Sequence, residues 1–138
     1  MVRYVLAWIP MLAIAIANGA LRQLVFANRL SELHAHQLST ITGSVFIGAF
    51  IWFVIRNWPP SSNRQARLIG FVWVCLTIVF ESFMGLALQH RTLAEVLQEY
   101  NLFAGRVWLL FLVWLAIAPW LFFHVRSRRD QRHANTGK

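Results

Sequence analysis

The chain has 138 residues, of which 58% are hydrophobic and 13% charged, and its formal net charge is +8. Soluble domains usually carry about 25% charged residues, so this composition excludes an ordinary soluble protein and predicts an integral membrane protein. A single cysteine excludes an internal disulfide and a thiolate metal cluster. The basic residues accompany no folded nucleic-acid-binding module, so we expect no nucleic-acid partner.

Four apolar segments are long enough to cross a membrane, because a hydrocarbon core of about 30 Å needs roughly 20 residues of helix. These segments are 4–27, 38–55, 68–88 and 103–125. They predict an all-α fold, a four-transmembrane-helix bundle that forms one domain over 1–125 and is followed by a basic tail at 126–138. The first segment also has features of a signal peptide, because Arg3 precedes it, but its length favours a membrane span.

Basic residues gather at one set of segment ends. They are Arg3, Arg56, Arg64, Arg67, Arg126, Arg128, Arg129, Arg132 and Lys138. Loops rich in arginine and lysine stay in the cytoplasm. We therefore expect a multi-pass protein of the bacterial inner membrane with both termini cytoplasmic and the tail on anionic lipid head groups. Near this boundary, Trp8, Trp58, Trp73 and Trp120 predict an aromatic belt.

The connection between the third and fourth segments predicts a short helix in the outer membrane interface. From Thr92, the sequence TLAE has the form of a capping box. Leu93, Val96 and Tyr100 then recur at helical spacing, which is typical of a helix with one apolar face. Asn101 is placed to end this helix or to cap the fourth span.

Three charged residues interrupt the apolar segments: Arg22, Glu81 and Arg106. At 1.5 Å per residue they lie roughly 27, 20 and 28 Å from the cytoplasmic ends of their segments, in the outer half of the bilayer. Charge is costly at that depth, so we expect Glu81 within direct or one-water reach of one of the arginines. Two arginines against one carboxylate leave a positive charge, which predicts an outward-facing polar pocket for an anionic lipid or a small anion.

Small and polar residues predict which helix faces meet around this pocket. Asn18 lies one turn before Arg22, and Thr40, Ser44 and Gly48 form a stripe on the second span. Helices in lipid turn such faces toward each other. The candidate ligand-binding residues are therefore Arg22, Arg106, Glu81, Asn18, Gln37, Thr40 and Asn101.

Other interpretations of the same residues remain open. Glu81 and an arginine can be a purely structural pair, and the chain can be a homo-oligomer or a structural subunit of a larger membrane complex. A small anion transporter or channel needs polar lining that the inner halves of the segments lack. A membrane enzyme acting on a lipid head group would use Glu81 with His36. We expect no cofactor and no metal, because His36 and His90 have no supporting carboxylate.

Short stretches of the chain resemble known families. NGALRQ and TGSVFIG are similar to the GALR and GSFxxG stretches of small four-helix fluoride channels. In the third span those channels carry TTFST, where this chain has LTIVFES, so the resemblance does not extend to the element that would imply channel activity. The combination of NGALR, AHQLST, FES, EYN and GR resembles small four-span bacterial inner-membrane proteins, which implies no activity.

Overall fold

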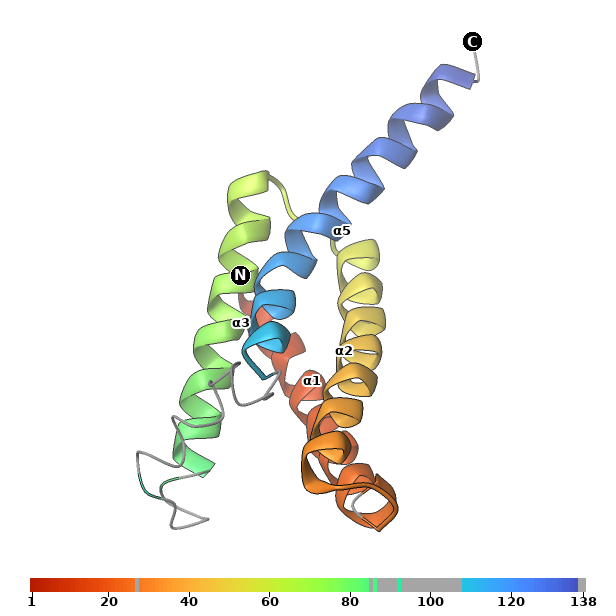
Figure 1. Ribbon diagram of the computed structural model, residues 1–138. Coiled ribbons are helices and arrows are strands. Elements are labelled where there is room, and N and C mark those ends of the chain that lie inside the picture. The colour runs from red at the N-terminus through yellow and green to blue at the C-terminus, as the bar shows by residue number, and fades with distance from the viewer. Residues whose placement is uncertain (27, 85, 87–91, 93–107, 137–138) are drawn as a thin grey trace.

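The computed structural model describes residues 1–26, 28–84, 86, 92 and 108–136, with side chains in the last helix described up to 128 (Figure 1). This part of the chain contains helices and no strand. They are α1 (Val2–Leu21), which continues as a π-helical segment η1 (Arg22–Phe26), then α2 (Glu32–Asn57), α3 (Asn63–Phe83) and α5 (Trp108–Thr136). The interfacial helix predicted after Thr92 lies outside the described residues.

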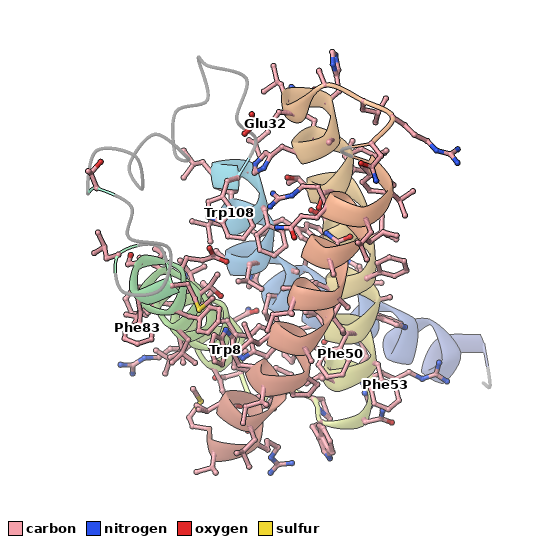
Figure 2. All side chains as sticks on the ribbon, turned by 90° about the horizontal axis from the view of Figure 1, so that it is seen from below. Trp8, Glu32, Phe50, Phe53, Phe83 and Trp108 are labelled. Carbon is pink, nitrogen blue, oxygen red and sulfur yellow. The ribbon has the colours of Figure 1, made fainter. Side chains whose placement is uncertain are left out.

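Four helical segments are each long and apolar enough to cross a membrane: Val2–Phe26, Glu32–Asn57, Asn63–Phe83 and Trp108–Arg128. Their outward faces carry large apolar side chains such as Leu24, Phe71 and Val79, which are 74%, 64% and 67% exposed. Figure 2 likewise shows Phe53 and Phe83 on the outside of the bundle. Such continuous apolar surface is unusual on a soluble monomer and suits contact with lipid tails. The fold is that of a small multi-pass membrane protein.

Two helices begin earlier than the apolar segments indicated. α2 begins at Glu32 rather than at 38, and α3 begins at Asn63 rather than at 68. Ser31 accepts a hydrogen bond from the backbone of His34, and Ser62 accepts one from Gln65. A serine N-cap starts a helix wherever its side chain satisfies a free amide group, whereas hydropathy marks only the lipid-facing part.

One end of the bundle, where α1 and α3 begin and α2 finishes, is called here the basic end because it carries Arg3, Arg56, Arg64, Arg67 and Arg126. Arg126 of α5 donates through Nη1 to the backbone oxygens of Ile55, at 3.3 Å, and of Arg56. The hydroxyl of Tyr4 donates to the Trp58 oxygen at 3.0 Å. These donors satisfy carbonyls that α2 leaves open at its C-terminus. Beyond this contact, α5 continues past the rest of the bundle (Figure 1).

The apolar core lies in the half of the bundle nearer the basic end. Its members come from all four helices: Tyr4, Ala7, Met11, Ile47, Ile51, Val54, Ile55, Ile69, Trp73, Phe111, Leu112, Leu115 and Ala118. Trp73 is fully buried, so its predicted place in an aromatic belt was wrong. The reason is that its ring fills the space between α1 and α3 rather than facing head groups.

Glycines allow the closest helix contacts. A methyl group at Gly70 of α3 would overlap the backbone carbonyl of Ala116 in α5. At Gly48 of α2, a methyl group would come within 3.0 Å of the Trp114 ring. Small residues are the usual means by which membrane helices approach each other, because lipid offers no hydrophobic drive for their association.

Candidate functional site

Two indole hydrogen bonds fix the axial register of α1 against α3. Trp73 Nε1 donates to the Tyr4 backbone oxygen at 2.7 Å, and Trp8 Nε1 donates to Thr77 Oγ1 at 3.1 Å. In each bond the two partners are 69 residues apart in the sequence. The second bond lies one helical turn after the first on α1 and also on α3. The two helices therefore run parallel, and one turn farther along Leu12 lies level with Glu81.

Asn18 fixes the register of α1 against α2. Its Nδ2 donates to the Ser39 backbone oxygen at 2.7 Å and to Ser39 Oγ at 2.9 Å. Its Oδ1 accepts from Thr42 Oγ1 at 2.8 Å. A methyl group at Gly43 would lie 2.9 Å from Asn18 Nδ2, so the glycine leaves room for this side chain. The Asn18 amide is thus a hydrogen-bonded spacer between two antiparallel helices.

Arg22 contacts His36 one turn farther along α1. The Arg22 Nη1 and His36 Nδ1 atoms are 3.0 Å apart. A guanidinium has only donors, so Nδ1 must accept, and the imidazole is neutral with its proton on Nε2. Nε2 of His36 is itself shielded from solvent. The contact therefore holds the Arg22 side chain in place without neutralising its charge.

The same registers separate Arg22 from Glu81. Arg22 lies ten residues beyond Leu12, which is level with Glu81, so the backbones of Arg22 and Glu81 are about 15 Å apart along the bundle. The structure brings Arg22 together with His36 and not with Glu81. Because His36 is level with Arg22, the enzyme interpretation that paired it with Glu81 gains no support from this arrangement. Arg106 lies outside the described residues, and its pairing with Glu81 stays a prediction.

Glu81 lines a small cavity between the four helices. The cavity volume of about 30 Å³ is sufficient for roughly two water molecules, since one needs about 10–15 Å³ on this measure. Its polar members are Glu81 and Thr77. The other described residues around it are apolar or aromatic: Trp8, Met11, Leu12, Ala15, Ile47, Phe80, Trp108, Phe111 and Leu115. Figure 2 shows Trp8 between α1 and α3.

The predicted polar stripe on α2 faces α5 instead of α1. Ser44 and Thr40 donate their hydroxyls to backbone oxygens of their own helix, at 2.7 and 2.9 Å. Trp114 of α5 donates to the Ser44 backbone oxygen at 3.2 Å and covers Gly48. The residues that meet Asn18, such as Ser39 and Gly43, each precede a stripe residue by one position in the sequence. Ser44 and Gly48 therefore pack against α5, and the predicted role of Thr40 in ligand binding stays a prediction. The predicted stripe (Thr40, Ser44 and Gly48) and the neighbouring face (Ala35, Ser39 and Gly43) both have small residues at four-residue spacing. The sequence alone therefore does not determine how α2 is rotated about its axis.

The remaining predicted site residues divide into two groups. Gln37 and Thr40 are half-buried on α2, close in sequence to His36. Asn101 and His90, like Arg106, fall outside the described residues. Among the described residues, no three histidine, cysteine, aspartate or glutamate side chains lie together so as to hold a metal ion.

Sequence reasoning missed four residues that organise this region: Trp8, His36 as an arginine partner, Ser39 and Thr42. The run Ala35, Ser39, Gly43, Ile47 and Ile51, at four-residue spacing, was the available signal for the buried face of α2.

Comparisons of the chain with protein-family models, with curated proteins and with solved structures each found no match.

Proposed function

We propose that the protein is a bacterial inner-membrane protein that binds an anionic lipid at the end of the bundle opposite the basic end, through Arg22. The observation that carries this proposal is the contact between Arg22 and the neutral ring of His36. This contact orients the Arg22 guanidinium without neutralising its positive charge. The expected orientation puts this site in the outer leaflet and both termini in the cytoplasm.

The depth of Arg22 suits a lipid phosphate. Arg22 lies eighteen residues beyond Tyr4, which is about 27 Å along α1. With Tyr4 at one boundary of a hydrocarbon core of about 30 Å, the guanidinium is near the level of the opposite head groups. The side chain is half-buried, beside the exposed Leu21 and Leu24, so a lipid can approach it sideways from the bilayer.

The donor geometry suits a phosphate as well. The bond to His36 uses one of the five N–H donors of the guanidinium. The remaining donors form the planar fork that binds phosphate through two parallel hydrogen bonds. The competing interpretation is an arginine that reaches the head-group region without selecting a lipid, as long basic side chains near helix ends often do.

Lipid retention separates these interpretations. Protein purified from membranes and reconstituted with phosphatidylglycerol and phosphatidylethanolamine would be compared by native mass spectrometry with two variants. Arg22→Gln should lose bound phosphatidylglycerol. Arg29→Gln, which removes an exposed arginine at the same end, should retain it. Equal retention in parent and both variants would refute the proposal, as would equal binding of the two lipids by the parent.

A second candidate function is assembly with another membrane protein or with a second copy. Ala13, Ala17 and Ala20 are all exposed along one side of α1, and exposed small residues at such spacing favour helix association in lipid. Cross-linking of single-cysteine variants at Ala17 would test this candidate in native membranes. A Cys75→Ser parent is needed for that experiment, because Cys75 is also exposed.

A further inference from the structure

We propose that one acyl chain of the bound lipid runs along α1 from Arg22 and ends in the cavity beside Trp8, in the middle of the bundle. This inference rests on the proposed lipid site at Arg22 and adds where the hydrocarbon part of that lipid lies. The occupant of the cavity is the end of an acyl chain of an anionic diacyl lipid whose phosphate contacts the Arg22 guanidinium.

The wall of the cavity suits hydrocarbon, because it is almost entirely apolar. The Trp8 indole and the Thr77 hydroxyl are hydrogen-bonded to each other, and Glu81 has an interaction partner of its own, so these groups do not depend on a ligand for a partner. Apolar cavities in proteins stay dry and accept apolar ligands. The cavity volume of about 30 Å³ has room for the last carbons of an acyl chain, since a methylene group is about as large as a water molecule.

One face of α1 connects the cavity with Arg22. Trp8, Leu12 and Ala15 line the cavity. Gly19 and Arg22 follow Ala15 at four-residue and then three-residue spacing, so they continue the same face away from the basic end. No described atom lies within 4 Å of the position that a Cβ would occupy at Gly19. The small side chains on this face therefore leave space beside α1 between the cavity and Arg22.

The length of a lipid chain matches this path. The backbone of Arg22 lies about 15 Å beyond Leu12 along α1. Each leaflet supplies half of a hydrocarbon core of about 30 Å, so an acyl chain covers about 15 Å between its head group and the midplane. Leu12 and Ile47, which line the cavity, are each within three residues of the midpoints of Val2–Phe26 and Glu32–Asn57. A chain whose phosphate lies at Arg22 therefore ends at the level of the cavity.

The bundle closes the cavity toward the basic end. Trp73 and Leu115 fill that half of the bundle and are at most 1% exposed, and a core packed in this way leaves no room for a chain to pass. The hydrogen bonds of Tyr4 and Trp8 join α1 to α3 in the same half. Toward the opposite end the two helices diverge (Figure 1). This arrangement favours entry of the chain from the side of Arg22.

Photolabelling tests where the end of the chain lies. Reconstituted protein would be equilibrated with a phosphatidylglycerol that carries a diazirine at the end of one acyl chain, illuminated and digested, and the labelled residues would be identified by mass spectrometry. We expect labels on Met11 and Phe111, which line the cavity and are only 2% and 5% exposed, so that bulk lipid does not reach them. Phe71 and Val79 face outward, report bulk lipid and should be labelled in every sample.

Two matched alanine variants test the path along α1. Ala15→Leu puts a larger side chain on the face that lines the cavity and should lower the labelling of Met11 and Phe111 several-fold. Ala13→Leu makes the same change on the exposed side of α1 and should leave this labelling unchanged. Arg22→Gln should also lower it several-fold, because the head group that holds the chain in place is released.

Two results would overturn the inference and leave head-group binding intact: labels on the outward-facing residues alone in the parent, or equal labelling of the cavity residues in the parent and in Ala15→Leu. Retention of phosphatidylglycerol in Arg22→Gln measures head-group binding separately. Cavity labels that persist in Arg22→Gln would overturn the inference too, by showing a chain that enters without its head group at Arg22. The labelling map of the parent needs no variant, so the test stays decisive if Ala15→Leu does not fold.

Discussion

Adding one methyl group to Gly70 tests the packing of α3 against α5. The new Cβ would overlap the Ala116 carbonyl, which belongs to the helix backbone and cannot swing aside as a side chain can. The two helices must therefore move apart. Overpacking of this kind typically costs about 1–3 kcal/mol, and Gly70→Ala should lose about that much stability.

The same substitution at Gly19 is the matched control. Gly19 is also inside a helix, but no atom lies within 4 Å of the position that its Cβ would occupy. Replacing a glycine by alanine in a helix interior gains about 0.5–1 kcal/mol, because the unfolded chain loses conformational freedom. Gly19→Ala should therefore stabilise the protein, opposite in sign to Gly70→Ala.

Unfolding in mixed micelles of a mild detergent and sodium dodecyl sulfate, followed by circular dichroism, measures both variants. The midpoint should move to lower denaturant for Gly70→Ala and to higher denaturant for Gly19→Ala. A Gly70→Ala protein as stable as the parent would show that α3 and α5 do not approach as closely as the structure has them. Loss of stability in both variants would refute the argument from local space.

The remaining predictions concern the polar contact of α1 and the topology. Asn18→Leu should lose about 1–3 kcal/mol, because it removes three hydrogen bonds and leaves the buried Ser39 hydroxyl without its donor. Thr42→Val removes one of the three and should lose only about 0.6 kcal/mol, so equal losses in the same micelle assay would contradict this account. A reporter fused to the C-terminus should be active in the cytoplasm and inactive on the outer side. The reverse result would place the Arg22 site in the inner leaflet.

Hydropathy could not predict the contacts within the candidate site, because they depend on the axial register and the rotation of the helices. Counting residues from the ends of apolar segments placed Glu81 and Arg22 within about 7 Å of each other in depth. The register that the indole hydrogen bonds set between α1 and α3 puts the backbones of Glu81 and Arg22 about 15 Å apart along the bundle. Small residues at four-residue spacing also occur on two faces of α2, so sequence could not select the face that meets Asn18.

The sequence by itself determined the class of this protein. Apolar runs of about twenty residues make helices that suit a bilayer, because length and transfer energy are local properties of each segment. The tertiary structure alone decided that Arg22 contacts His36 and that Glu81 lies level with Leu12. Rotation and axial register depend on specific side-chain contacts between helices far apart in the sequence, and these contribute nothing to the hydropathy of either helix.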